Sequence, residues 1–286
     1  MRYIFKPVKG YVFTKYVIER IERGEVEVSL DLGRSITKVE IQNDSVVLPN
    51  SLKISLSYLR ESVKQRDRAY FIEENGKEIF EISISTPRRY YKLMIVSPDT
   101  APTLEISGIH MHRIKDITPL EDTLEKVRLA DIKKGHRVLD VCTGLGYTAI
   151  YSLKRRASTV VTIEKDPYVL EIARYNPWSR ELASEKIEII LADASKYIRE
   201  LQDESFDRII HDPPRFALAG ELYSLEFYKE LYRVLKNGGV LFHYTGAPGV
   251  KKGFKFQSSV AARLRRAGFL RIRIIKDFAV VAYKTS

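Results

Sequence analysis

Residues 140–149 contain a glycine pattern that lets a backbone approach a nucleotide closely. Gly144, Gly146 and Ala149 form a G-x-G-x-x-A spacing directly after an apolar stretch that predicts a strand. Glycine permits the sharp turn, and the N–H groups of the following helix point toward a ligand. Glu164 stands 20 residues after Gly144, at the end of the next predicted strand. A carboxylate there can accept hydrogen bonds from both hydroxyls of a ribose, so the pattern predicts a ribose-bearing ligand.

Two acidic residues favour S-adenosylmethionine over a nicotinamide dinucleotide as that ligand. Asp140 lies four residues before Gly144 on the first strand. A carboxylate at this position suits a ligand that has a cationic methionine end and no pyrophosphate. Asp193 closes the third predicted strand and can accept a hydrogen bond from an adenine amino group. No Tyr-Lys or His-Asp hydride-relay pattern is evident in the sequence, so a dehydrogenase ranks last among the interpretations.

The segment Asp212-Pro213-Pro214 follows the fourth predicted strand. Ligands of open α/β sheets bind at the carboxyl ends of the strands, so we expect this segment beside the donor methyl group. The Asp212 carboxylate and the Pro213 carbonyl could accept both hydrogens of one exocyclic amino group and aim its lone pair at that methyl. Positioning of this kind supplies up to ~7–11 kcal/mol. The alternative is a rigid turn after a buried strand.

Residues 120–286 resemble a Rossmann-like class I S-adenosylmethionine-dependent methyltransferase. Asp140, Thr143, Gly144 and Gly146 match the first motif of that family, Glu164 matches the second and Asp193 the third. The resemblance implies that these residues hold the methionine moiety, the ribose and the adenine respectively. The complete set of expected cofactor-binding residues is Asp140, Thr143, Gly144, Gly146, Glu164, Lys165, Asp193 and Ala194.

The Asp-Pro-Pro segment resembles the (Asp/Asn/Ser)-Pro-Pro-aromatic motif of amino-methyltransferases that act on adenine N6, cytosine N4 or guanine N2. The fourth position departs from that motif, because it holds Arg215 and the aromatic Phe216 comes one residue later. Either the Arg215 guanidinium or the Phe216 ring would then stack on the base. The expected catalytic residues are Asp212, Pro213, Pro214, Arg215 and Phe216.

The charge distribution favours a polyanionic partner. The 286-residue chain carries a formal net charge of +11, and residues 251–276 hold nine Lys/Arg and no Asp/Glu. Cations contact phosphates and interleaved aromatic residues stack on splayed bases, although a solvated basic face would have the same composition. The expected nucleic-acid-binding residues are Arg88, Arg89, Tyr90, Arg113, Lys251, Lys252 and Lys255.

Two kinds of element must position these residues. Residues 1–105 alternate with period two between turn signals, which predicts a small, mainly β N-terminal domain for substrate recognition. Residues 106–286 alternate apolar runs with helical patterns, which predicts an α/β domain with a doubly wound, mostly parallel sheet of seven strands. The predicted strands are 137–141, 159–164, 187–191, 206–211, 240–244, 271–275 and 278–283, and the helices begin near Tyr147, Pro167, Ala194, Leu225 and Ser258. The last strand follows a two-residue turn and is expected to be antiparallel.

Composition excludes several classes of protein. The single cysteine, Cys142, excludes an intramolecular disulfide and a cysteine-rich zinc site, and it favours a reducing, cytoplasmic interior. No apolar run of membrane-spanning length is present.

His110 and His112 alternate but lack an evident third ligand, so we expect structural histidines and no metal. The high charge content resembles that of thermophile proteins.

The first hypothesis is therefore an RNA methyltransferase that acts on an exocyclic base nitrogen. Cytosine N4 of rRNA is favoured over guanine N2 or adenine N6, and tRNA is a further candidate substrate. RNA is preferred to DNA because a folded RNA can present an unstacked base, whereas a DNA enzyme must flip it. The alternative is a small-molecule transferase such as a polyamine aminopropyltransferase. A non-catalytic RNA-binding module would be expected to lack the intact cofactor positions.

Overall fold

The computed structural model describes residues 1–76, 78–246 and 253–285, which divide into two compact units. Unit 1 contains Met1–Phe5, Thr123–Pro167 and the chain from Leu182 onward, and unit 2 contains Lys6–Asp122 and Tyr168–Glu181. The division thus differs from the boundary expected after residue 105. The first strand of the chain belongs to the C-terminal fold, and a segment near residue 175 belongs to the N-terminal one.

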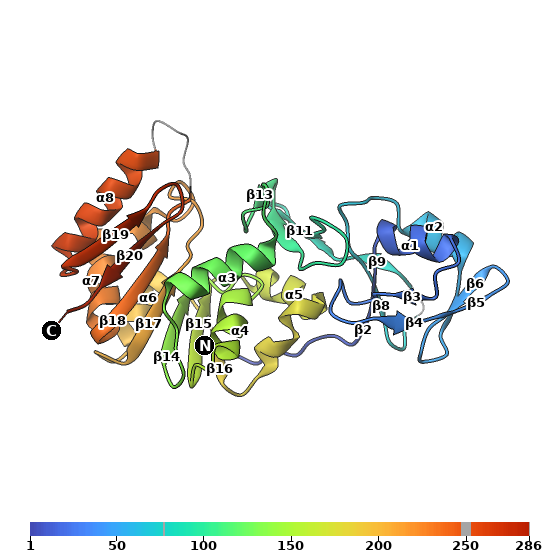
Figure 1. The fold of residues 1–286 in the computed structure, drawn as a ribbon, viewed down its shortest axis with the longest axis horizontal. Helices are drawn as coiled ribbons and strands as arrows, with labels where there is room; N and C mark the ends of the chain where they lie inside the picture. The colour runs from blue at the N-terminus through green and yellow to red at the C-terminus, as the bar shows by residue number, and fades with distance from the viewer. Residues whose placement is uncertain (77, 247–252, 286) are drawn as a thin grey trace. The chain divides into compact units, whose positions relative to one another are not determined.

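Unit 1 is built on an eight-stranded sheet with the order β1-β16-β15-β14-β17-β18-β20-β19 (Figure 1). Six strands are mutually parallel, while β20 and the edge strand β1 run antiparallel to their neighbours. All seven expected strands are present, and β1 adds an eighth because its backbone pairs with β16. The strands are β1 (Arg2–Tyr3), β14 (Arg137–Val141), β15 (Thr159–Glu164), β16 (Ile187–Leu191), β17 (Phe206–His211), β18 (Leu235–Tyr244), β19 (Arg271–Ile275) and β20 (Ala279–Tyr283).

The strand order reverses direction between β14 and β17. From β14 the chain proceeds outward to β15 and β16, and it then returns to the other side of β14 with β17. The carboxyl ends of β14 and β17 therefore flank the switch point of the sheet, which is where open α/β sheets bind ligands. The glycine pattern follows β14 and the Asp-Pro-Pro segment follows β17.

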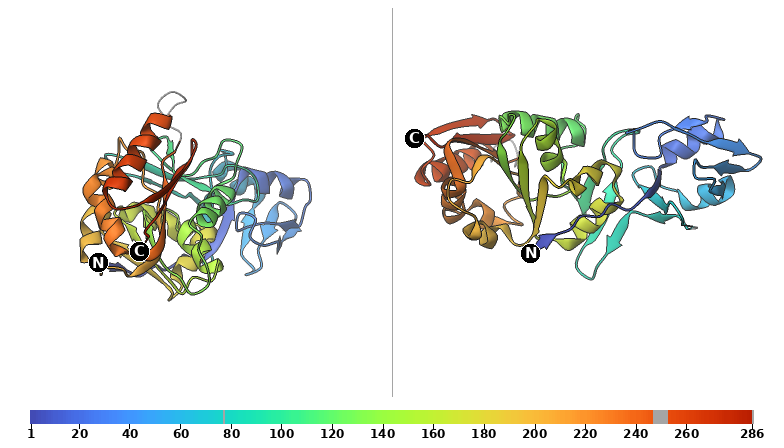
Figure 2. Two further views of the ribbon diagram at one scale, coloured as in Figure 1. Left: turned by 60° about the vertical axis from the view of Figure 1, so that its left-hand side comes forward. Right: turned by 90° about the horizontal axis from the view of Figure 1, so that it is seen from below.

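Helices cover the sheet on both faces (Figures 1 and 2). The helix α7 packs against α8 and β18, and α8 also contacts β19 and β20, whereas α4 contacts β14 and β15. The helix α8 begins at Gly253, five residues before the expected start near Ser258. The helices are α3 (Pro119–Leu129), α4 (Tyr147–Lys154), α5 (Pro167–Tyr175), α6 (Ala194–Tyr197), α7 (Leu225–Val234) and α8 (Gly253–Arg266), with 3-10 turns at Pro177–Ala183, Ile198–Glu200 and Gly220–Tyr223.

The core beneath α7 and α8 consists of fully buried apolar side chains. Phe206, Phe242 and Phe269 are among the largest side chains with almost no exposed surface. They lie in or beside strands that are buried on both faces, which explains why those strands read as continuous apolar runs rather than alternating ones. This packing fixes the strand ends that carry the candidate site.

Unit 2 consists of several small antiparallel sheets, two short helices and nearly all of α5. The first strand after α1 is only Glu27–Val28, and Leu32 and Gly33 adopt left-handed turn conformations shortly after it. The helix before it begins at Lys15, since Thr14 caps its first turn and Val12–Phe13 belong to a strand. The elements are β2 (Gly10–Phe13), α1 (Lys15–Glu22), β3 (Glu27–Val28), β4 (Thr37–Lys38), β5 (Glu40–Gln42), β6 (Ser45–Val47), β7 (Lys53–Ser55), α2 (Leu56–Ser62), β8 (Tyr70–Glu73), β9 (Phe80–Glu81), β10 (Ser83–Ser85), β11 (Tyr90–Met94), β12 (Thr103–Ile106) and β13 (Ile109–His110).

No helix among the described residues is both long and apolar enough to cross a membrane.

Candidate active site

The glycine loop after β14 turns through left-handed backbone conformations. Gly144 has φ +54° and Gly146 has φ +79°. A Cβ built at Gly146 would lie 2.5 Å from the Leu182 side chain, so this glycine is required for packing. A Cβ built at Gly144 would meet no atom within 4 Å. The loop therefore leaves open space on the side of Gly144, as a loop that receives a ligand must.

Glu164 closes the loop from the end of β15. Its Oε2 accepts the Gly144 N–H at 3.0 Å, and its Oε1 accepts the N–H groups of Lys165 and Asp166 at 2.9 and 3.0 Å. Burial raises the pKa of Glu164, and these backbone hydrogen bonds offset part of that rise. The carboxylate is thus held at the strand end that the sequence analysis assigned to the ribose.

Asp140 lies inside the protein beneath the glycine loop. It has no exposed surface, and its two oxygens accept hydrogen bonds from Thr148 at 2.8 Å and Thr162 at 2.7 Å. The Thr143 hydroxyl lies 2.7 Å from that of Thr162 and extends the chain of hydroxyls. Burial raises the pKa of Asp140 to about 7, against the effect of the two hydroxyls. Both oxygens of Asp140 are thus engaged by hydroxyls, and the carboxylate supports the loop from within.

Asp193 lies at the end of β16 and caps α6. Its Oδ1 accepts the Ser195 N–H at 2.9 Å and the Ser195 hydroxyl at 2.6 Å. Burial would raise the pKa of Asp193, but the bonds from Ser195 outweigh it and the pKa is lowered. Ala194 is buried beside it, whereas the Lys165 side chain is 44% exposed and lies 3.6 Å from Glu221. The expected cofactor residues therefore gather at the ends of three adjacent strands.

Asp212 lies at the neighbouring strand end. Its N–H donates to the Val141 carbonyl at 3.2 Å, so the Asp-Pro-Pro segment starts directly beside the glycine loop. Its Oδ2 accepts a hydrogen bond from Nζ of Lys126 at 2.7 Å. Lys126 is 1% exposed and comes from α3, and its Nζ also lies 4.5 Å from the ring centroid of Tyr244. A buried ammonium thus holds the carboxylate in a fixed orientation.

Tyr223 fixes the prolines that follow. Its hydroxyl donates to the Pro214 carbonyl at 2.9 Å, and burial raises the pKa of this hydroxyl, so it stays protonated. No described residue donates a hydrogen bond to the Pro213 carbonyl, which leaves that oxygen as the candidate acceptor beside Asp212. Arg215 is exposed, and the Phe216 ring is 49% exposed with its centroid 5.5 Å from that of Tyr223.

Two buried histidines stack behind this loop. The rings of His211 and His243 are 4.3 Å apart between centroids, and neither residue has exposed surface. His211 Nε2 donates to the Leu222 carbonyl at 2.9 Å, and His243 Nε2 lies 2.9 Å from the Tyr228 hydroxyl. Burial lowers the pKa of His211 to about 3 and lowers that of His243 as well. Both rings are therefore neutral at physiological pH.

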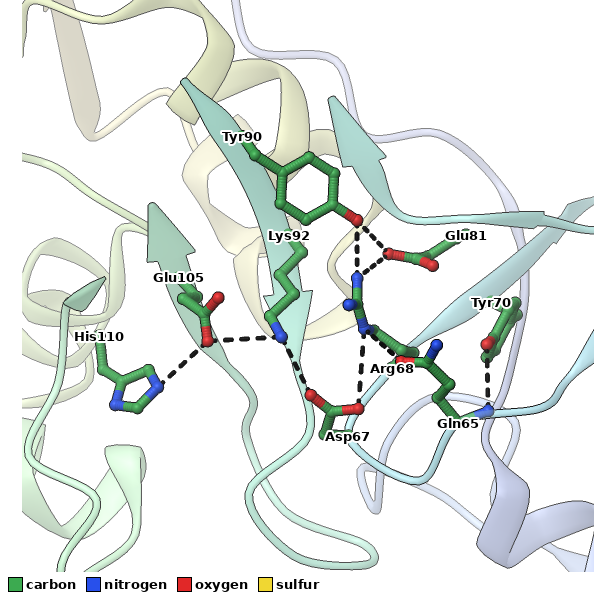
Figure 3. Close-up of polar contacts among 9 residues, drawn as sticks. All are labelled: Gln65, Asp67, Arg68, Tyr70, Glu81, Tyr90, Lys92, Glu105 and His110. Carbon is green, nitrogen blue, oxygen red and sulfur yellow. Dashed lines mark hydrogen bonds and ion pairs between the residues drawn. The ribbon is translucent and has the colours of Figure 1, made fainter. Parts of the chain in front are cut away.

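The basic residues expected to bind nucleic acid do not all lie free on the surface. Arg88 and Arg89 are exposed. The Tyr90 hydroxyl donates to Glu81 at 2.7 Å and accepts from Arg68 at 2.6 Å, within a polar network on β8 to β13 (Figure 3). The Arg68 guanidinium also lies over the Tyr90 ring at 5.7 Å. One face of the Tyr90 ring and its hydroxyl are therefore engaged within this network.

Arg113 forms an ion pair with a buried carboxylate. Its Nε donates to Oδ1 of Asp122, which has no exposed surface, while the Arg113 side chain is 28% exposed. This pair links the chain before α3 to that helix. Lys255 is exposed on α8, whereas Lys251 and Lys252 lie outside the described residues.

The remaining candidates are structural. His110 lies 3.2 Å from Glu105 and His112 lies 2.9 Å from Thr103. Within the described residues, no group of three or more His, Cys, Asp or Glu side chains is placed to hold a metal ion. Burial raises the pKa of the Cys142 thiol well above its usual value, so the thiol is not a thiolate nucleophile.

Lys126 and Tyr223 both contact the Asp-Pro-Pro segment, and neither residue was predicted from the sequence. Lys126 lies on a helix that was not predicted, although Thr118 and Glu121 form a capping pattern at its start. Tyr223 lies nine residues after Pro214 in a 3-10 turn without periodic signal. Only tertiary structure brings either residue to the loop.

Comparison with known proteins agrees with this geometry. A family model described as "Methyltransferase domain" matches residues 138–239. The chain is 47% identical over 283 residues to the uncharacterized protein MJ1233 of Methanocaldococcus jannaschii, with 96% of each chain covered. This chain belongs to the MJ1233 family. The region matched by the family model starts within β14 and includes the glycine loop, Glu164, Asp193 and Asp212.

More distant relatives fall into two groups. The ribosomal RNA large subunit methyltransferase I of Photobacterium profundum is 33% identical over 135 residues, which are 44% of this chain and 34% of that protein. The polyamine aminopropyltransferase of Clostridium kluyveri is 31% identical over 176 residues, which are 60% of this chain and 64% of that protein. The chain thus spans about a third of the length of the first relative and less than two thirds of the second.

A solved structure shows the same fold. Spermidine synthase from Thermotoga maritima superposes with a TM-score of 0.56 at 19% identity, and the match covers 74% of this chain and 77% of that one. The likeness establishes the architecture of the sheet and its helices. The fold and the matched methyltransferase domain over residues 138–239 agree with the class I S-adenosylmethionine-dependent methyltransferase fold expected from the sequence.

Proposed function

We propose that this protein methylates an exocyclic amino nitrogen of a base in RNA. Our first choice is cytosine N4 of rRNA, ahead of guanine N2 and adenine N6. The observation that carries the proposal is the position of Asp212-Pro213-Pro214 beside the glycine loop, joined by the hydrogen bond from the Asp212 N–H to Val141. A carboxylate and a proline carbonyl would then lie at the strand end next to the expected donor site.

The residues present fit the cofactor. The space beside Gly144 would be filled by any side chain at that position. Glu164 would accept the ribose hydroxyls, and Asp193 with Ala194 would contact the adenine. Asp140 and Thr143 would act indirectly, by holding the loop through Thr148 and Thr162. When bound, S-adenosylmethionine supplies an electrophilic methyl group.

The loop residues would then prepare the nucleophile. An exocyclic amine on an aromatic ring is a weak nucleophile because its lone pair is delocalised into the ring. The Asp212 carboxylate and the Pro213 carbonyl would each accept one amino hydrogen, which orients the lone pair and favours pyramidal nitrogen. Asp212 can take the proton that the nitrogen loses when it is methylated. Lys126 holds the carboxylate in place throughout by its 2.7 Å hydrogen bond to Oδ2.

Several surface features support RNA as the substrate. Phe216 presents a half-exposed ring close to the reacting loop, which can stack on the target base. Arg215, Lys255, Arg88 and Arg89 are exposed cations that suit phosphates. We assign substrate recognition to the N-terminal domain. The relatives named as rRNA methyltransferases favour rRNA, with tRNA as a further candidate.

A polyamine aminopropyltransferase is the second candidate. One relative is named a polyamine aminopropyltransferase, and the superposed structure is named a spermidine synthase. Its substrate is a polycation, which would be expected to favour an acidic cleft. The net charge of +11 and the run of nine cations in residues 251–276 disfavour that substrate.

Comparison of the nucleosides of total RNA from cells with and without the gene tests the proposal. We expect one methylated nucleoside to be absent from the deletion strain, to return with the intact gene, and to stay absent with Asp212→Ala. Unchanged RNA nucleosides together with an altered polyamine pool would favour the aminopropyltransferase instead.

A further inference from the structure

A pocket of about 580 Å³ lies beside the Asp-Pro-Pro segment in unit 1. It is lined by Phe216 and by five residues of α8: Phe256, Ser259, Ala262, Arg263 and Arg266. Phe256, Ser259, Arg263 and Arg266 are spaced three or four residues apart, so they share one face of the helix, and Ala262 borders that face. The candidate site described above uses only Phe216 of this set.

Aromatic rings form one wall of the pocket. The Phe256 centroid lies 6.0 Å from that of Phe216 and 5.7 Å from that of Tyr223. Tyr223 is the residue whose hydroxyl holds the Pro214 carbonyl. Tyr223 therefore contacts both Phe256 of the pocket and Pro214 of the reacting loop, so the pocket lies next to that loop.

Two arginines make the other wall cationic. Arg263 is fixed, because its Nη1 donates to the Tyr223 carbonyl at 2.8 Å. Arg266 is exposed and forms no ion pair within the described residues. The lining includes no acidic residue, and the sequence has none between residues 251 and 276. Aromatic rings beside unpaired cations match the stacked base and the phosphate of a single-stranded nucleotide.

We propose that this pocket binds the nucleotide adjacent to the target base in single-stranded RNA. The base of that nucleotide stacks against Phe256, while Phe216 stays available to the target base. The phosphate of the adjacent nucleotide pairs with Arg266. The inference rests on the proposed function and adds to it, since the enzyme would then require an unpaired neighbour beside the methylated base.

The neighbouring Arg265 offers a matched control. It is exposed, lies one residue from Arg266 on α8, and does not line the pocket. Arg265→Ala and Arg266→Ala remove the same charge from the same helix. A difference between the two variants therefore reports the pocket rather than the overall charge of the protein.

The experiment uses rRNA from cells that lack the gene, at about 0.1 M salt. We expect Arg266→Ala to weaken RNA binding and raise the RNA KM about five- to tenfold, the effect of one lost phosphate contact, with kcat unchanged. Phe256→Leu should weaken RNA binding roughly tenfold through lost stacking. The RNA affinity and the RNA KM of Arg265→Ala should stay within about twofold of the wild-type values. The S-adenosylmethionine Kd, measured by calorimetry, should be unchanged in all three variants, which shows that the fold is intact.

The outcomes separate this proposal from the one it rests on. If the wild type methylates the RNA but the Arg265 and Arg266 variants behave alike, the pocket assignment is wrong and the proposed function stands. If the wild type neither binds nor methylates RNA, both proposals fall.

Discussion

Lys126 and Asp212 form a charge pair in which the two partners differ in exposure. The lysine is 1% exposed and the carboxylate 17%. A buried ammonium is stable only when paired, so Lys126 depends on Asp212 for its charge and Asp212 depends on Lys126 for its orientation. The pair therefore links the stability of unit 1 to the geometry of the reacting loop.

Replacement of Lys126 by Met tests this link. We expect Lys126→Met to lower the free energy of unfolding by about 2–3 kcal/mol, because the half-buried carboxylate loses its counter-charge. We expect kcat to fall roughly 100-fold through misplacement of the carboxylate, with little change in the S-adenosylmethionine Kd. Urea unfolding and methyl-transfer rates measure the two effects.

The double variant Lys126→Met/Asp212→Asn is the control. It leaves no unpaired charge, so it should recover part of the stability but none of the activity. Equal destabilisation in the single and double variants would show that the two side chains are not energetically coupled.

The buried histidines predict a pH dependence of stability. The pKa of His211 is lowered from 6.5 to about 3 in the folded protein, so below pH 6.5 the unfolded chain binds a proton that the folded one does not. Stability is therefore lost as the pH falls from 6.5 toward 3, by up to ~1.4 kcal/mol per pH unit for this residue. Between pH 7 and pH 5 the wild type should lose about 2 kcal/mol more than His211→Gln in chemical unfolding. Parallel curves for the two proteins would argue against a neutral buried His211.

Residue types alone indicated Gly144, Glu164, Asp193 and Asp212, because glycine and carboxylates at strand ends have few other uses. The same reasoning could not show that Asp140 faces inward or that Arg113 pairs with a buried Asp122. The orientation of Asp140 and the partner of Arg113 depend on which side chains meet in the folded protein. The local sequence around each residue does not report such tertiary contacts.

At the scale of elements, the glycine loop depends on two glycines for different reasons. At Gly146 a Cβ would overlap Leu182, whereas at Gly144 it would enter open space. Both positions have positive φ, so each alanine substitution also carries backbone strain.

The two alanine variants should therefore separate folding from cofactor binding. Gly146→Ala should destabilise the protein by about 2–4 kcal/mol, from strain and overpacking together. Gly144→Ala should cost only ~1–2 kcal/mol but should weaken S-adenosylmethionine binding at least tenfold, since it fills the space left for the ligand. Calorimetric titration and urea unfolding of both variants measure the contrast. Similar cofactor affinities for Gly144→Ala and the wild type would reject the loop as the binding site.

The strands of unit 1 were predictable because parallel strands buried on both faces give uninterrupted apolar runs. The strands of unit 2 were less so, because many are two or three residues long and end at local turns such as Leu32–Gly33. The pairing of β1 with β16 joins residues 1–5 to a strand about 190 positions away, and no periodic pattern reports such a contact.

At the scale of the whole molecule, the net charge of +11 should make RNA binding sensitive to salt. With about four phosphate contacts to single-stranded RNA, affinity should fall roughly 50-fold between 50 and 200 mM salt. S-adenosylmethionine binding does not depend on such contacts and should change little. Filter binding for RNA and calorimetry for the cofactor compare the two. An RNA affinity that is independent of salt would rule out phosphate contacts as the source of binding.

Transfer of a labelled methyl group by the purified protein tests the central claim most directly. Unmodified rRNA from cells lacking the gene is incubated with S-adenosylmethionine, and the digested nucleosides are analysed by mass spectrometry. The account predicts a methyl group on an exocyclic base nitrogen, cytosine N4 first, from the wild type and none from Asp212→Ala. Methyl transfer to a ring carbon or a ribose hydroxyl, or an equally active Asp212→Ala, would contradict it.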